Sequence, residues 1–86
     1  MTDTASIIRQ KLAVLEPISL QIQDDSAAHA GHRGNGGGGH FNLEIRSAKF
    51  DGVGPVERHR MIFNLLSEEM RGAIHALSIR AIASNE

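Results

Sequence analysis

The spacing of apolar residues near the start of the chain predicts a helix. These residues recur every three or four positions, which places them on one helical face. They are Ala5, Ile8, Leu12 and Leu15. Asp3 or Thr4 can cap the first turn, because a short side-chain oxygen accepts a hydrogen bond from an amide that lacks a helical partner. Pro17 disfavours helical backbone at the preceding residue, so we expect the helix to end there.

Two later segments alternate between apolar and polar residues, the pattern of strands with one face on a core and one in water. Their apolar positions are Ile18, Leu20 and Ile22 in the first segment and Phe41, Leu43 and Ile45 in the second. Because residues 24–40 join them directly, the simplest expectation is an antiparallel hairpin with a long connection.

The second half of the chain predicts a turn, a helix and a final strand. Residues 49–54 contain an Asp-Gly turn signal, and Pro55 suits the first position of a helix. A helical stripe follows, comprising Val56, Ile62, Phe63, Leu66 and Met70. We expect a break near Ser67 and an end to the helical region at Gly72. Leu77 and Ile79 then alternate with polar residues as in a strand.

The predicted order is therefore helix, strand, strand, helix, strand. With both helices on one face of a three-stranded sheet, this is a two-layer α+β fold, and residues 1–86 are expected to form a single domain. The pattern leaves the partner and direction of the last strand open.

Composition narrows the functional classes. The net charge of −1, with histidines neutral, gives no general attraction to nucleic acid. The chain contains no cysteine, so it supplies neither a thiolate ligand nor a thiol nucleophile. We find no recognisable catalytic set and expect no enzymatic activity. No apolar run approaches the roughly 20 residues of a membrane span. A cytoplasmic protein is expected.

The connection 24–40 is rich in histidine and glycine. It holds three of the five histidines and six of the nine glycines. Gly34, Gly36 and Gly39 formally match a phosphate-binding G-x-G-x-x-G pattern, but that motif requires a helix after the glycines. A strand pattern follows here, which argues against nucleotide binding.

The loop histidines have several possible roles. His29 and His32 are spaced so that they could share a zinc, copper, nickel or iron ion. Together with Arg33 they could also contact phosphate, or simply form a solvated polar loop. Their spacing does not distinguish these roles.

The remaining histidines border predicted apolar faces. His75 has the strand parity of Leu77 and Ile79, so we expect its ring on the core side, at the rim of the apolar layer. His59 is interpreted as a structural histidine at the edge of the core. Arg58 and Arg60 flank it and are expected to face outward as a small basic patch.

Four segments of the sequence closely resemble the BolA family: DDSAAHAGH, HFNLEIRSAKFDG, VERHRMIFNLL and IHALSIRA. The resemblance extends from about Ile8 to Ala83. It implies an α-β-β-α-β fold similar to a class II KH domain. The nucleic-acid-clamping GxxG of KH domains lies between two helices, whereas Gly31–Gly34 lies between two strands here. KH-type RNA binding is therefore not implied.

The resemblance also implies a partner and a cofactor. BolA-like proteins associate with monothiol glutaredoxins, share a bridging 2Fe-2S cluster with them and act in iron-sulfur cluster trafficking or iron regulation. The histidine of IHAL, His75, would be one ligand. The loop would provide the second, His29 in first preference, with His32 and His40 as alternates because the loop departs from the family in length and glycine content. Glutaredoxin and glutathione would supply one thiolate each.

Two other functions stay open. Some BolA-like proteins are DNA-binding transcriptional regulators, for which Arg58, Arg60 and Arg71, with Arg80 beside them, are the candidate contacts. The loop histidines could alternatively make the chain an autonomous zinc or nickel binder.

Overall fold

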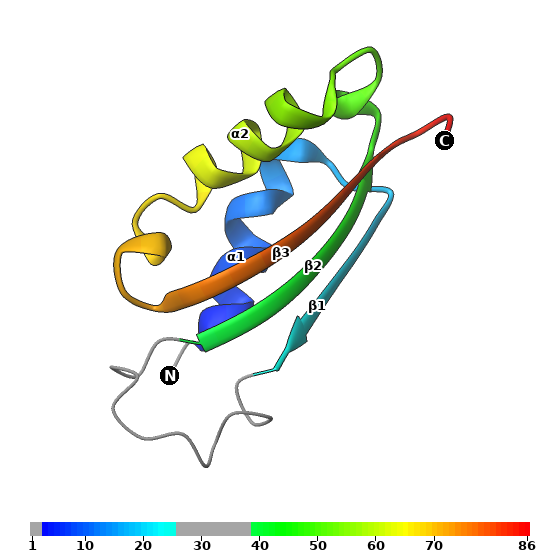
Figure 1. The fold of residues 1–86 in the computed structure, drawn as a ribbon. Helices are drawn as coiled ribbons and strands as arrows, with labels where there is room; N and C mark the ends of the chain where they lie inside the picture. Colours follow the sequence, from blue (N-terminus) through cyan, green and yellow to red (C-terminus); the bar gives the residue numbers. More distant parts are fainter. Residues whose placement is uncertain (1–2, 26–38) are drawn as a thin grey trace.

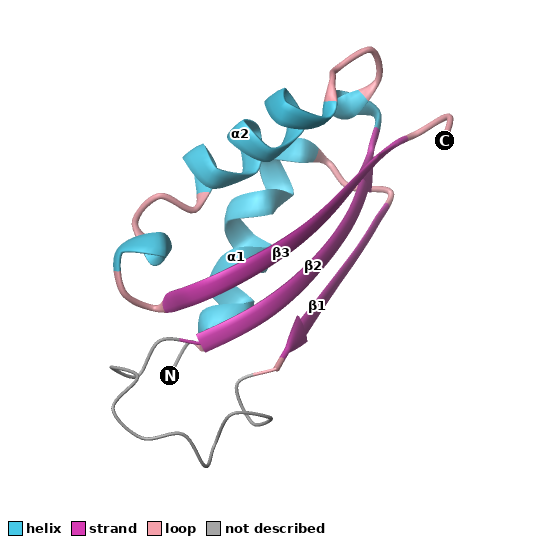
Figure 2. Cartoon of the chain, in the orientation of Figure 1, coloured by secondary structure: helices cyan, strands magenta, loops and turns pink. Residues whose placement is uncertain are grey.

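The computed structural model describes residues 3–25 and 39–86. Its main elements are α1 (Thr4–Leu12), β1 (Ser19–Asp24), β2 (Gly39–Ser47), α2 (Pro55–Leu65) and β3 (Ile74–Ala83). Three short 3-10 helices lie between them, η1 (Ala13–Leu15), η3 (Ala48–Phe50) and η4 (Glu69–Arg71). Both α-helices pack on one face of the sheet, which confirms the predicted two-layer α+β fold (Figures 1 and 2).

The sheet has the strand order β1-β2-β3, so β2 is central. β1 pairs antiparallel with β2, as predicted for the hairpin, with Leu20 opposite Ile45. β3 pairs with the other edge of β2 in the parallel direction, with Leu43 opposite Ile79. The sequence pattern left this last pairing open. It brings the starts of β2 and β3 to the same end of the sheet.

The first helix forms as the sequence predicts. Asp3 caps it by accepting a hydrogen bond from the Ser6 amide at 2.8 Å. Its apolar face is buried: Ile8 and Leu12 are fully covered, and Leu15 in η1 is nearly so. The helical region ends at Glu16, whose positive φ of 49° turns the chain toward β1.

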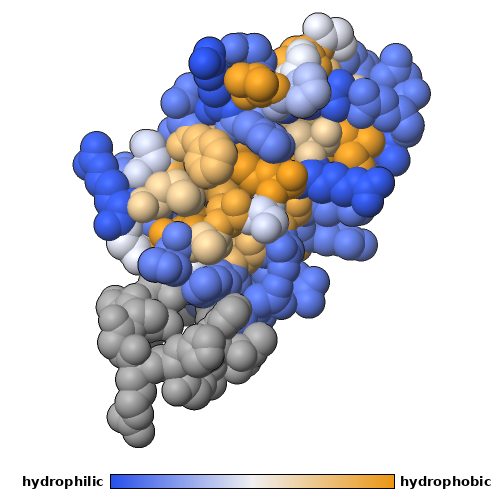
Figure 3. All heavy atoms as spheres, in the orientation of Figure 1, coloured by the Kyte–Doolittle hydropathy of each residue, from blue (hydrophilic) through white to orange (hydrophobic). Residues whose placement is uncertain are grey.

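Three predicted core positions are exposed instead. Ile62 and Leu66 are fully buried, but Val56 and Phe63 of the same predicted stripe are 64% and 38% exposed. Val56 and Phe63 lie seven residues apart and so share one side of α2, whereas Ile62 and Leu66 lie on the side that packs against the core. Ile18 is 62% exposed, since β1 begins only at the next residue. Apolar atoms therefore reach the surface, as the face shown in Figure 3 illustrates.

The end of β3 is held by contacts that we call the C-terminal clasp, formed by Arg46, Asp51, Arg58, Ser84 and Glu86. Arg58 makes a two-pronged ion pair with Glu86, with nitrogen to oxygen distances of 2.8 and 2.9 Å. The same guanidinium donates to the carbonyl oxygens of Val53 at 2.7 Å and Ala81 at 3.0 Å. Arg58 is thus only 11% exposed at its side chain, contrary to the prediction that it faces outward.

The rest of the clasp joins the C-terminal residues to the turn after β2. The Asp51 carboxylate accepts hydrogen bonds from the Ser84 amide at 2.8 Å and the Ser84 hydroxyl at 2.6 Å. Arg46 donates to the backbone oxygens of Ala83 and Glu86. The hydrogen bonds from Arg58 and from the Ala83 amide lower the pKa of Glu86 to about 2. Polar contacts from β2, from the turn after it and from α2 thus hold the C-terminal residues at this end of the sheet.

Candidate metal-binding site

His75 is placed by an irregularity between β2 and β3. Gly39 is opposite Ile74, whereas the next residue, His40, is opposite Ala76. His75 is thus the extra residue of a β-bulge, a feature that redirects side chains. Ile74 enters the core at 2% exposure, and His75 is exposed. The prediction that His75 points toward the core was therefore wrong, because strand parity is interrupted at this residue.

The exposed ring of His75 lies beside the ring of His40. Their centroids are 5.2 Å apart and the rings are tilted by 41°. His40 is half-buried and alternates along β2 with the buried Phe41. The two histidines come from neighbouring parallel strands, at the end where both strands begin. This arrangement gives two imidazoles that can bind one ligand together.

Of the three loop histidines considered as partners of His75, the described residues include only His40. His29 and His32 lie outside the described residues, so their positions relative to His75 stay predictions. His40, the third alternate, is the loop-side histidine whose ring contacts His75. Within residues 3–25 and 39–86, no cluster of three or more metal-ligating side chains is present. The described part of the chain thus offers a pair of ligands.

A small depression adjoins His40. It has a volume of about 110 Å³ and is lined by Asp25, His40, Phe41, Asn42, Ala76 and Ser78. The Asp25 amide donates to the His40 carbonyl oxygen at 2.7 Å, and the Asn42 amide group donates to the Asp25 carboxylate. Asp25 was not identified from the sequence. These bonds fix the backbone of His40 between β1 and β3.

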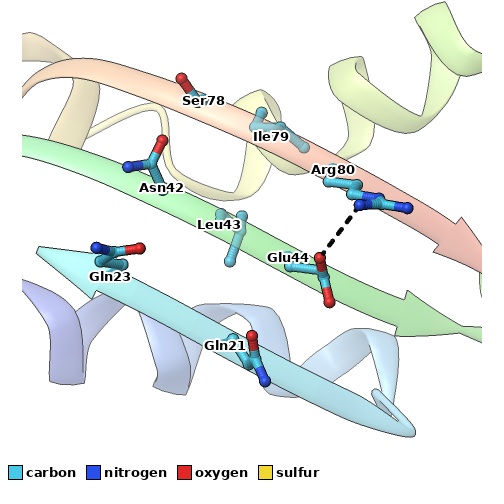
Figure 4. Close-up of a pocket in the computed structure, with 8 residues that line it drawn as sticks. All are labelled: Gln21, Gln23, Asn42, Leu43, Glu44, Ser78, Ile79 and Arg80. Atoms are coloured by element: carbon cyan, nitrogen blue, oxygen red, sulfur yellow. Dashed lines mark ion pairs between the residues drawn. The ribbon is translucent and has the colours of Figure 1, made fainter.

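A shallow polar groove continues along the sheet from this depression (Figure 4). Its volume is about 260 Å³, and its lining residues are Gln21, Gln23, Asn42, Leu43, Glu44, Ser78, Ile79 and Arg80. Glu44 and Arg80 form a loose ion pair at 3.8 Å, which offsets the one positive charge in the lining. Uncharged amides and hydroxyls dominate the rest, so this groove has little attraction for a phosphate backbone.

The arginines predicted to contact nucleic acid are separated. Arg58 belongs to the C-terminal clasp, and Arg60 pairs with Glu57 on the surface of α2 at 2.9 Å. Arg71 is exposed in η4. Arg80 lies in the polar groove. His59 is exposed, so its interpretation as a structural histidine at the core edge was wrong.

The fold places this chain in the class of two-layer α+β domains with two helices on one face of a three-stranded sheet. The chain belongs to the BolA family: the model of that family, described as BolA-like protein, matches residues 12–86. The resemblance seen in the sequence is thereby confirmed.

Similar proteins agree with this assignment. The chain is 48% identical over 80 residues to Protein BOLA1, chloroplastic, of Arabidopsis thaliana, covering 87% of this chain and 50% of that protein. It is 37% identical over 81 residues to the DNA-binding transcriptional regulator BolA of Haemophilus influenzae, covering 93% of this chain and 77% of that protein. Among solved structures, BolA1 from Arabidopsis thaliana superposes with a TM-score of 0.82 at 38% identity, covering 100% and 98% of the two chains.

The relatives also differ in length. The chain spans 22% of SufE-like protein 1, chloroplastic/mitochondrial, of Arabidopsis thaliana, to which it is 46% identical over 81 residues, 86% of this chain. It spans about half of the length of the BOLA1 relatives. The names of both plant proteins indicate organelles, so the expected cytoplasmic location stays a prediction. No helix in the described part of the chain is long and apolar enough to cross a membrane.

Proposed function

We propose that this BolA-like chain is a non-enzymatic partner of a monothiol glutaredoxin, with which it binds a bridging 2Fe-2S cluster through histidines. Its role would be iron-sulfur cluster trafficking or iron regulation. The observation that supports this proposal is the pairing of the His40 and His75 rings. Their centroids lie 5.2 Å apart, at the end of the sheet where β2 and β3 begin.

The spacing of these rings suits a shared metal. Two imidazoles on one tetrahedral ion, with metal–nitrogen bonds of about 2.0–2.1 Å, have ring centres roughly 5 Å apart. The observed separation of 5.2 Å between the ring centroids matches this value. Family resemblance favours His75 with His29, whereas the geometry of the described residues favours His75 with His40. The experiment below distinguishes the two pairs.

The ligand chemistry explains why a partner is needed. A 2Fe-2S cluster requires four ligands besides its sulfides, and this chain contains no cysteine. Two histidines would bind one iron, while glutaredoxin and glutathione would each supply a thiolate. Neutral imidazoles reduce the negative charge of such a cluster and raise its reduction potential, as in Rieske centres.

The test is to mix the chain with a glutaredoxin that carries a glutathione-ligated cluster and to record visible circular dichroism and EPR spectra. We expect a new spectrum with histidine ligation. It should be abolished by His75→Ala and altered by either His40→Ala or His29→Ala, which identifies the second ligand. His59→Ala removes another exposed histidine and serves as the matched control. Absence of a new spectrum with the unaltered chain would refute the proposal.

DNA binding is a second candidate, favoured by the name of the Haemophilus influenzae relative. The exposed contacts on this chain would be Arg60 and Arg71. Arg58 is a poor test residue because it holds the C-terminal clasp. Binding that weakens with salt and is reduced in the Arg60→Ala, Arg71→Ala double variant would support this function. No binding at low salt would exclude it.

A further inference from the structure

A partly buried ion pair joins α1 to the segment that leads into β3. Glu69, in η4, is only 9% exposed, yet its side chain is a carboxylate. The Lys11 ammonium lies 2.8 Å from one Glu69 oxygen and 3.0 Å from the other. The hydrogen bond from Lys11 lowers the pKa of Glu69, so the carboxylate is charged at neutral pH. A buried charge requires such a partner, because its desolvation is otherwise uncompensated.

This pair lies at one end of the short connector that leads into β3, the strand that carries His75. After Glu69, the connector passes through the exposed Gly72 and Ala73 before Ile74 enters the core. The Ala73 carbonyl oxygen accepts a hydrogen bond from the Gly39 amide at 3.0 Å. Gly39 and Ala73 precede His40 and Ile74, respectively. The connector is therefore hydrogen-bonded to the residue that precedes His40 in β2.

The other end of the ion pair is firmly held. Lys11 lies on α1 between Ile8 and Leu12, both fully buried. The backbone of Lys11 is therefore fixed relative to the core. Its side chain contacts Glu69 and so links η4 to α1. Between Leu66 and His75, the described residues that are buried are Glu69 and Ile74, and Met70 is partly buried against the core.

We propose that Lys11 and Glu69 are positioning residues that hold His75 opposite His40. They act through the connector that leads into β3, the strand from which the bulged His75 projects. The expected effect on cluster affinity rests on the proposed function. The expected effect on the positions of the two rings is independent of it.

The experiment measures the ring geometry directly, in the unmodified chain and in Glu69→Gln and Lys11→Met variants. The readout is the nuclear Overhauser effect between the His40 and His75 ring protons in the metal-free protein, together with amide hydrogen exchange at Ile74 and Ala76. Glu57→Gln breaks the exposed Glu57–Arg60 pair, whose side chains are 61% and 68% exposed, and is the matched control. Ile62→Val, in the buried part of α2, controls for a general loss of stability.

We expect the ring-to-ring effect to lose most of its intensity and exchange at Ile74 and Ala76 to accelerate in both pair variants, but in neither control. In the complex with glutaredoxin, cluster affinity should fall about tenfold, the lower range for residues that orient metal ligands. Should Glu69→Gln fail to fold, Glu69→Asp keeps the charge but shortens the side chain, and the same displacement is expected.

Unchanged ring contacts in folded pair variants would overturn the positioning role, and so would an equal effect in Ile62→Val. If the ring contact depends on the pair but His75→Ala leaves the cluster spectrum intact, the positioning inference stands and the proposed ligand role fails. The two hypotheses are thus separable.

Discussion

The two ends of the β2–β3 strand pair are built differently. At the end where both strands finish, the C-terminal clasp ties β2, α2, the turn after β2 and the C-terminal residues together. At the end where both strands begin, the exposed His75 ring lies beside the half-buried His40, and the Lys11–Glu69 ion pair joins α1 to the segment that leads into β3. The contrast is between stabilising contacts at one end of these strands and the proposed ligands at the other end.

The largest loss of stability should come from a substitution in the core next to the clasp. Phe50, in η3, is fully buried. Phe50→Ala should lower the free energy of unfolding by about 3–5 kcal/mol, through lost burial and the cavity that remains. Urea denaturation measures this loss. In the fraction that stays folded, the contact between the His40 and His75 rings should persist; its loss would show that the two ends are coupled.

A smaller loss of stability is expected when the clasp itself is opened. Arg58→Ala removes the two-pronged pair with Glu86 and leaves the Val53 and Ala81 carbonyl oxygens without this donor. The melting temperature should fall clearly more than for Arg60→Ala, which breaks only a surface pair worth little. Equal melting temperatures for the two variants would contradict the assigned role of the clasp.

The clasp should also make stability depend on acid pH. The pKa of Glu86 is about 2 in the folded chain, below its ordinary value of 4.5. The unfolded chain therefore binds the proton more readily, and stability is lost as the pH falls from about 4.5 toward 2. Urea unfolding across this range should show the loss, and Glu86→Gln should reduce its pH dependence. An identical pH profile for the variant would argue against Glu86 as the titrating group.

The smallest effect on stability is expected from a substitution at the end of the sheet where β2 and β3 begin. His75 is exposed, so His75→Ala should change the free energy of unfolding by less than about 0.5 kcal/mol. The same variant should abolish histidine ligation of the cluster. Thermal unfolding of the isolated chain provides the measurement, and a large destabilisation would assign His75 a structural role instead.

The fold was largely predictable because its elements have clear periodicity. Leu43 and Ile45 alternate with polar residues in a strand whose outer face is open to solvent, and Ile8 and Leu12 follow a helical repeat. These local patterns fix element type. They do not encode the partner of β3, which depends on contacts between residues far apart in sequence, such as Leu43 and Ile79.

The candidate site was less predictable, for two physical reasons. One extra residue in β3 shifts the alternation, so the parity that places Leu77 on the core side fails at His75. The pairing of His75 with His40 also depends on this register, whereas the resemblance to the family ranked His40 behind His29 and His32. Likewise, the sequence pattern predicted an outward-facing Arg58, because its partner Glu86 is 28 residues away in the chain.

The hydrogen bond between Asp25 and His40 has a consequence for how such sequences can diverge. It holds the two ends of the segment 26–38 next to each other at 2.7 Å, from the Asp25 amide to the His40 carbonyl oxygen. Chain segments of very different length can join two points so close together, since the entropy of closing a loop rises only slowly with its length. Insertions and deletions between residues 26 and 38 should therefore be tolerated in evolution while the His40–His75 pair keeps its register.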